Sequence, residues 1–173
     1  MFRSTAAKAA LLGAVLLGGC GAKEPAPELA AATPLFRAER FFAGPTAGEG
    51  ALKIVFKDAE SIRVQGSGTV APDGTLILDQ TVWRGTRRPQ KRQWRMRQIG
   101  PGRYSGTLSD ATDRVRGEAK GNRLFLTYPM KGGVTAEQWI YLQPDGRTAL
   151  NRMRITKLGM TVARLDETIR KLD

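Results

Sequence analysis

The feature that most constrains the fold is a series of short alternating runs between residues 51 and 157, with a turn signal after almost every run. Alternation of apolar and polar residues is typical of antiparallel strands that are buried on one face only. Residues 75–84 show it most clearly. One face of that run carries Leu76, Leu78, Gln80 and Val82, and the other carries Ile77, Asp79, Thr81 and Trp83. Residues 91–99 alternate in the same way and place Arg92, Trp94 and Met96 on one face.

The turn signals indicate hairpin connections between consecutive strands. Pro-Asp-Gly occurs at 72–74 and at 144–146, and Gly-Asn occurs at 121–122. Proline presets φ in such turns, and Asp-Gly tolerates left-handed geometry. About nine strands in roughly 120 residues are too many for a flat open sheet, and closing the sheet removes its exposed edges. Residues 35–173 are therefore predicted to form one all-β domain, a lipocalin-like antiparallel β-barrel of about 8–10 strands. The alternative is a two-sheet β-sandwich.

The two ends of this domain have other patterns. Phe36, Phe41 and Phe42 form an aromatic segment that we expect to plug or skirt one end of the barrel, before a glycine-broken loop at 44–50. At the C-terminus, apolar residues recur at the spacing of a helical stripe, which predicts a short C-terminal helix packed on the sheet. The stripe consists of Val162, Leu165, Ile169 and Leu172.

The first residues carry the features of a bacterial export signal. Arg3 and Lys8 precede an apolar stretch at 9–17, which is too short to span a bilayer of about 30 Å as a helix. Gly18 and Gly19 then precede Cys20, the only cysteine in the chain. This pattern predicts a lipoprotein signal peptide at 1–19 and lipidation of Cys20, which explains the unpaired thiol. The alternative is an ordinary secretory signal followed by a free thiol.

Residues 20–34 then form the lipidated cysteine and a Pro/Ala tether. This segment lacks large apolar residues, so we expect it not to pack and to hold the domain off the membrane. Gly21, rather than aspartate, follows Cys20. By resemblance to lipoproteins of Gram-negative bacteria, this favours a protein of the cell envelope, anchored in the outer membrane and facing the periplasm.

The composition excludes several function classes. The chain has no histidine, so it has no Ser-His-Asp or Cys-His centre and lacks the commonest metal ligand. Its carboxylates form no convincing close pair, so we expect neither an enzyme nor a metal site nor a cofactor. The net charge of +12 would suit nucleic acid, but the export signal opposes that reading. An anionic lipid surface is the favoured electrostatic partner, and a merely solvated basic exterior is the alternative.

The candidate site lies on the face that carries Gln80, Arg92 and Trp94. If that face points inward, Arg92 needs an anion or several acceptors to offset its desolvation. A fatty-acid carboxylate or a lipid phosphate would meet that need, with neighbouring apolar residues receiving the chain. Tyr128, Trp139 and Asn151 could add polar groups from later strands. Alternatively, Arg92 bridges Gln80 and backbone carbonyls inside a filled barrel.

An ordered set of short motifs runs through the domain. It comprises Phe41-Phe42-x-Gly44, Gly74-x-Leu76-x-Leu78, Arg92-x-Trp94, Gly117-x-Ala119-x-Gly121-Asn122 with Tyr128, Gln138-Trp139-x-Tyr141, and Asn151-Arg152 with Lys157-x-Gly159. The set resembles the family known as domain of unknown function 3833, over about residues 35–172. That family includes predicted lipoproteins of the bacterial envelope, so the resemblance implies a fold and a cellular location without implying an activity. Gln80 departs from the family pattern, which implies a glutamate there.

Two functional hypotheses remain. The first is a membrane-anchored lipoprotein whose barrel binds or carries an apolar, acidic, lipid-like molecule. The second is a structural or accessory lipoprotein that acts through its surface. The carrier requires a cavity lined by the Arg92 face, whereas the accessory role predicts a filled barrel.

Overall fold

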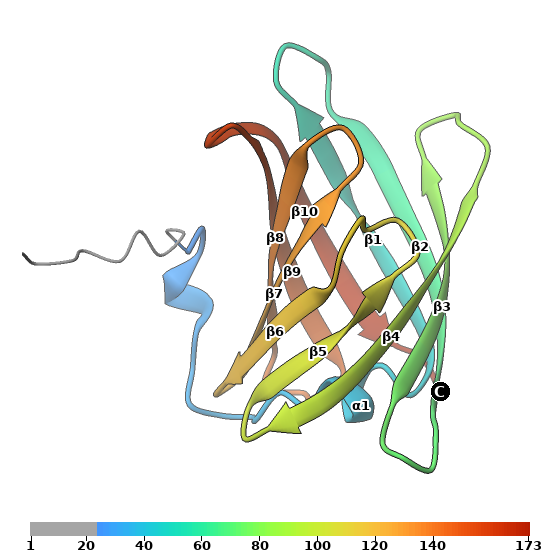
Figure 1. The fold of residues 1–173 in the computed structure, drawn as a ribbon, viewed down its shortest axis with the longest axis vertical. Helices are drawn as coiled ribbons and strands as arrows, with labels where there is room; N and C mark the ends of the chain where they lie inside the picture. The colour runs from blue at the N-terminus through green and yellow to red at the C-terminus, as the bar shows by residue number, and fades with distance from the viewer. Residues whose placement is uncertain (1–23) are drawn as a thin grey trace, which may run out of the picture.

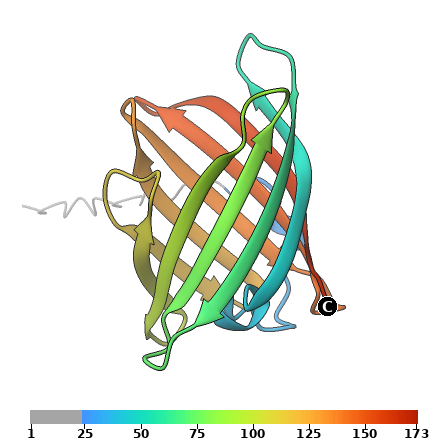
Figure 2. The same cartoon turned by 90° about the vertical axis from the view of Figure 1, so that its right-hand side faces the viewer.

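The computed structural model describes residues 24–173, so the signal peptide at 1–19 and Cys20 lie outside the described residues. Ten antiparallel strands close into one barrel in which each strand pairs with the next and β10 pairs with β1 (Figures 1 and 2). The strands are β1 (Gly44–Ile54), β2 (Glu60–Val70), β3 (Leu76–Arg84), β4 (Gln90–Gly100), β5 (Arg103–Leu108), β6 (Val115–Lys120), β7 (Arg123–Met130), β8 (Val134–Leu142), β9 (Thr148–Lys157) and β10 (Met160–Lys171). The predicted barrel is confirmed. Within residues 24–173, no helix is long and apolar enough to cross a membrane.

The apolar side chains fill the barrel from two ends. The larger cluster includes Leu76, Leu78, Trp94 and Met96, all on the inward faces of β3 and β4 as the alternation predicted. A smaller cluster near the opposite end consists of Leu52, Ile62, Val64 and Ala163. The polar side chains of the interior lie where these two clusters approach each other.

The predicted aromatic plug is confirmed. Helix α1 (Ala38–Phe41) closes one end of the barrel, at the bottom of Figure 1. The rings of Phe36, Phe41 and Phe42 pack on one another, with 4.9 Å between the centroids of Phe41 and Phe42. Gly68 of β2 makes this close approach feasible, because a Cβ there would overlap the carbonyl oxygen of Phe42.

The predicted C-terminal helix is wrong, because residues 160–171 form strand β10. In the strand the inward residues are Ala163, Leu165, Glu167 and Ile169, which follow a period of two. The register shifts between Thr161 and Ala163, and this irregularity hid the alternation. Pairing with both β1 and β9 satisfies the backbone on both sides of β10 and closes the barrel, which an isolated short helix could not do.

The glycine-broken loop predicted at 44–50 is also wrong, because these residues begin β1. Their small size suits the tight contact between β1 and β10. A Cβ at Gly50 would overlap the backbone of Asp166, and a Cβ at Gly48 would overlap the carboxylate of Glu167. The glycines therefore bring the two ends of the sheet together rather than interrupt the strand.

Residues 24–34, called the strap below, pack on the barrel instead of forming a free tether. The strap contains a short 3₁₀ turn, Pro27–Leu29, and crosses the outer face of β7 and β8 (Figure 1). Ala26 is buried against Trp139 and Tyr141. The prediction that this segment cannot pack failed because hydrogen bonds and one ion pair to the barrel replace the missing large apolar side chains.

Candidate functional site

Neighbouring strands bring the predicted residues Gln80, Arg92 and Trp94 together inside the barrel. In the register of β3 and β4, Gln80 lies opposite Arg92, and Leu78 lies opposite Trp94. The Gln80 side-chain oxygen accepts hydrogen bonds from Arg92 Nε at 2.8 Å and from Trp94 Nε1 at 2.9 Å. The Arg92 guanidinium also lies 5.8 Å from the centre of the Trp94 ring. One amide oxygen thus orients both a cation and an indole.

Tyr128 extends this cluster across the barrel from β7. Its ring meets Trp94 edge-on at 5.3 Å, and its hydroxyl donates to the Gln138 side-chain oxygen at 3.3 Å. Burial raises the pKa of Tyr128 to about 12, so the hydroxyl keeps its proton at neutral pH. Tyr128 is therefore a fixed neutral donor.

Asn151 reaches the same interior from β9 and pairs with a residue that the sequence analysis missed. Its Nδ2 donates to Glu167 Oε2 at 2.7 Å. Burial raises the pKa of Glu167, while the hydrogen bond from Asn151 and the charge of Arg92 act in the opposite direction. The neutral acid is thereby favoured at a higher pH than usual. Within residues 24–173, the buried Oδ1 of Asn151 has no hydrogen-bond partner.

Glu167 escaped notice because its segment was assigned to a helix. A signal was nevertheless present, since Glu167 occupies one position in a period-two run of inward apolar residues. A carboxylate in such a run indicates either a buried partner or a ligand.

The structure does not bring Trp139 to this site. Trp139 points to the outside of β8, where the strap covers it together with Tyr141. The guanidinium of Arg154 lies 5.3 Å from its ring. Its neighbour Gln138 points inward instead, because successive side chains of a strand lie on opposite faces.

The interior cavity next to these polar groups has a volume of about 40 Å³. Since one water occupies about 30 Å³ of the liquid, this space holds one or two waters. Its walls combine the polar side chains of Gln80, Arg92, Gln138 and Glu167 with Ala38, Phe42, Leu76, Leu78, Trp94, Met96, Leu124, Leu126, Ile140 and Ile169. The cavity therefore has one polar side and otherwise apolar walls.

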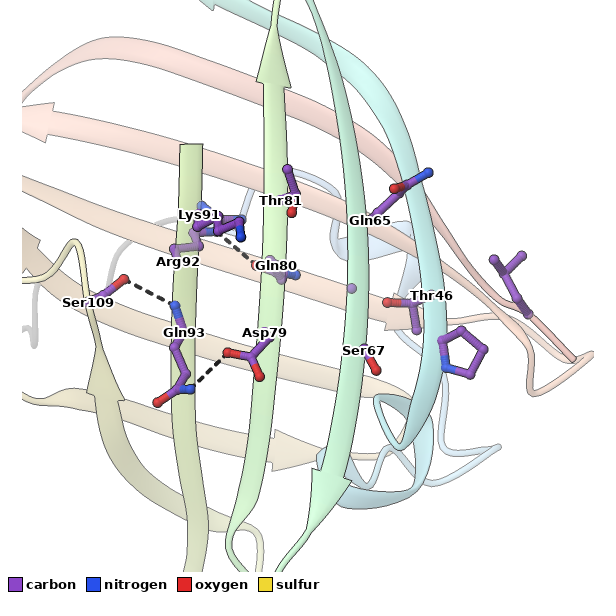
Figure 3. Close-up of a pocket in the computed structure, with 13 residues that line it drawn as sticks. Thr46, Gln65, Ser67, Asp79, Gln80, Thr81, Lys91, Arg92, Gln93 and Ser109 are labelled. Carbon is purple, nitrogen blue, oxygen red and sulfur yellow. Dashed lines mark hydrogen bonds between the residues drawn. The ribbon is translucent and has the colours of Figure 1, made fainter. Parts of the chain in front are cut away.

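A larger hollow of about 710 Å³ extends across β1 to β4 (Figure 3). Its lining shares Gln80 and Arg92 with the interior cluster and adds outward-facing polar residues such as Asp79 and Gln93. Gln93 donates to Asp79 Oδ1 at 2.8 Å, and its backbone N–H donates to Ser109 Oγ at 3.1 Å. The outer part of the hollow is open to solvent, and Asp79, Gln93 and Ser109 already bond one another there, so the interior side of Gln80 and Arg92 is the stronger candidate for a specific site.

The interior cluster can bind a polar head group, and its chemistry favours an anion. Arg92 supplies a guanidinium group to the cavity, and Glu167 supplies a carboxyl group whose pKa is raised by burial. In the described part of the chain, no group of three or more His, Cys, Asp or Glu side chains could hold a metal ion.

Three solved structures share this fold at low sequence identity. The S-type phycobiliprotein lyase CPES from Guillardia theta matches with a TM-score of 0.63 and 8% identity, covering 78% of this chain and 90% of that one. Rv2717c from M. tuberculosis matches with a TM-score of 0.60 and 14% identity, covering 87% of this chain and 99% of that one. A protein of the DUF3598 family from Nostoc punctiforme matches with a TM-score of 0.59 and 13% identity, covering 81% of this chain and 51% of that one.

At these identities the likeness shows the fold alone, a lipocalin-like barrel. Among curated proteins, none matches the chain. The family described as protein of unknown function DUF3833 matches residues 14–171, nearly the whole chain, in agreement with the resemblance seen in the motifs. The chain therefore belongs to the DUF3833 family.

Proposed function

We propose that this protein is a lipid-anchored lipoprotein of the bacterial envelope whose barrel binds a small, apolar molecule with an acidic group. The observation that carries the proposal is Arg92, a cation inside the barrel whose hydrogen-bond acceptor, Gln80, is neutral. Among residues 24–173, no carboxylate oxygen lies within 4.0 Å of the Arg92 guanidinium. A cation that is partly removed from water is stabilised by an anion, and a ligand would supply it.

The surroundings of Arg92 support an anionic ligand. Glu167 lines the same cavity as Arg92, and burial raises the pKa of its carboxyl group above the ordinary value, so this acid is a weaker counter-charge for Arg92 than an exposed carboxylate would be. The unpartnered Oδ1 of Asn151 requires a donor, which a bound water would provide. A carboxylate or phosphate group next to Arg92 would supply the counter-charge.

The apolar walls would receive the remainder of the ligand. Leu76, Leu78 and Met96 line the cavity beside Trp94. A fatty-acyl chain exceeds 40 Å³, so its binding requires wall residues to move. Met96 has a flexible thioether, and Phe42 belongs to the plug rather than to a strand. We therefore expect these two side chains to move when the ligand binds.

The cellular location of the protein is part of the same proposal. An export signal at 1–19 and a lipid on Cys20 would place the barrel on the outer membrane, facing the periplasm. The role is one of binding rather than catalysis, because the cluster lacks a nucleophile with an adjacent base.

The second candidate is a structural or accessory lipoprotein that acts through its surface. The small volume of the interior cavity favours it, since a filled barrel needs no ligand. In that case the hydrogen bonds of Gln80 to Arg92 and Trp94 would serve the packing of the barrel alone.

Native mass spectrometry of the full chain, purified gently from its own host, distinguishes the two candidates. The carrier predicts a co-purifying acidic, apolar molecule. Arg92→Ala should remove it, because the ligand loses its counter-charge. The variant should still fold, with a free energy of unfolding about 1 kcal/mol lower, since Gln80 still accepts the hydrogen bond from Trp94.

Arg95→Ala is the matched control, because Arg95 lies on the same strand and is exposed on the outer face. It should retain the ligand. A ligand-free mass that persists after incubation with fatty acids and phospholipids would contradict the carrier and favour the accessory role.

A further inference from the structure

Two adjacent hairpin tips project from the end of the barrel opposite α1 (Figure 1). One tip joins β1 to β2 at residues 55–59, and the other joins β9 to β10 at residues 158–159. The backbone links them, because Val55 N donates to the carbonyl oxygen of Val162 at 3.0 Å. The two hairpins are therefore neighbours in the closed sheet.

Four large apolar side chains stand in solvent on these tips. Phe56 is fully exposed, and the exposed fractions of Leu158, Met160 and Val55 are 89%, 67% and 43%. We call these four residues the apolar tips. Single exposed apolar residues are ordinary, but four on two linked hairpins indicate a surface that meets an apolar environment.

The backbone at the apolar tips makes these residue choices unfavourable for folding alone. Phe56 has φ of 63° and Leu158 has φ of 49°, the left-handed region that favours glycine or asparagine. Other turns of the barrel use glycine at positive φ, as Gly74 and Gly121 do. A phenylalanine and a leucine at such positions cost stability without gaining a contact within the fold, so their contribution must lie outside it.

Basic residues surround the apolar tips. Lys53 and Lys57 flank Val55 and Phe56, and Lys157 precedes Leu158. Lys131 belongs to the next hairpin, whose strand β8 pairs Val134 with Lys157. All four lysines are exposed. Of the nearby acids, Glu60 is already paired with Arg84 and Arg87, which leaves Asp58 as the local opposing charge.

We propose that the apolar tips insert into the surface of a bilayer that contains anionic phospholipid, with the lysines at the headgroups. Apolar side chains framed by lysine are the combination that binds such interfaces, because burial in the acyl boundary and attraction to anionic lipid act together. A protein partner would instead have to present acidic groups to the lysines and an apolar surface to the apolar tips. This inference does not depend on a ligand inside the barrel.

The test uses the full chain with Cys20→Ser, which cannot be acylated, and co-sedimentation with phosphatidylglycerol/phosphatidylcholine vesicles. Phe56→Ser with Leu158→Ser should weaken binding about tenfold or more, since two large side chains lose their apolar environment. Val70→Ser with Ile99→Ser is the matched control. These residues are also exposed and apolar, but they lie at the α1 end, so binding should persist.

Salt and lipid composition test the role of the lysines. Raising the salt concentration, or using pure phosphatidylcholine, should weaken binding by the parent chain. Vesicle binding that depends neither on the salt concentration nor on the lipid composition would overturn the proposal that the surface is anionic.

A fluorescent label gives a second readout. With Cys20→Ser in place, Leu158→Cys provides the only thiol for an environment-sensitive dye, and Val70→Cys provides the control. The dye at 158 should shift to the blue on anionic vesicles, whereas the dye at 70 should not.

Equal vesicle binding by the parent and by Phe56→Ser with Leu158→Ser would overturn the proposal. So would a dimer that the double variant dissociates without any change in vesicle binding, because the tips would then contact a second copy. Unfolding does not complicate these results, since both side chains are exposed. Thermal denaturation should show a fold at least as stable as the parent.

Discussion

Asn122→Ala should loosen the strap on the barrel. Asn122 is buried, and its side chain makes three hydrogen bonds. Nδ2 donates to the carbonyl oxygen of Leu29 at 3.0 Å and to that of Leu142 at 2.9 Å, and Oδ1 accepts from Ala31 N at 2.7 Å. Two of the three partners belong to the strap, so one side chain joins it to the β6–β7 turn.

The magnitude follows from these contacts. A hydrogen bond contributes about 1 kcal/mol net, so Asn122→Ala should lower the free energy of unfolding by about 3 kcal/mol. About 2 kcal/mol of this is lost from the docking of the strap, which corresponds to a roughly 30-fold rise in its undocked population. Glu24 still bonds Tyr141 at 2.8 Å and pairs with Arg123, so the strap should loosen first at residues 29–31.

Hydrogen exchange and fluorescence report the two effects separately. The Ala31 amide, whose acceptor the substitution removes, should exchange faster, and Trp139 should emit at longer wavelength as the strap uncovers it. Gln98→Ala is the control, since that exposed amide bonds the nearby carbonyl of Gly100 and does not contact the strap. Unchanged Ala31 exchange together with the parent's free energy of unfolding would refute the assigned role of Asn122.

Two further predictions concern the plug and the buried acid. Gly68→Ala should destabilise the fold by about 1–3 kcal/mol in urea denaturation, because its Cβ would overlap the Phe42 carbonyl, whereas Ser67→Ala on the exposed face should not. Burial raises the pKa of Glu167 above its ordinary 4.5, so the folded state binds more protons between that value and the folded pKa. The free energy of unfolding of the parent should therefore fall, relative to that of Glu167→Gln, as the pH rises above 4.5; a constant difference from pH 4 to 8 would contradict this.

The strand alternation in the sequence was enough to predict the barrel and the inward face of its central strands. Leu76, Leu78, Trp94 and Met96 were placed correctly because β3 and β4 pair with each other without a register shift, so a strict period of two assigns each side chain to one face. The same reasoning placed Gln80 beside Arg92. A local pattern suffices where pairing is regular.

The failures have one physical cause, which is that long-range contacts leave little local trace. In β10, the register shift near Thr161 obscures the alternation, and pairing with β1, more than a hundred residues earlier, decides the structure. Trp139 was expected at the site because its strand was recognised, but the sequence did not show which of its residues point inward. An error of one residue in that alternation places a side chain on the opposite face of the sheet. The strap carries almost no apolar signal, since its docking depends on Asn122 and Glu24.

The docked strap also changes what the proposed lipid anchor would do. A free tether over residues 20–34 would extend to about 50 Å, at roughly 3.5 Å per residue, and would let the barrel leave the bilayer. With Glu24 bound to Tyr141 and Arg123, the chain from Cys20 to Glu24 reaches at most about 14 Å. A lipid on Cys20 would then hold the outer wall of β7 and β8 close to the membrane. Because Asn122 fixes the strap, the orientation of the barrel would depend on one buried amide as well as on the anchor.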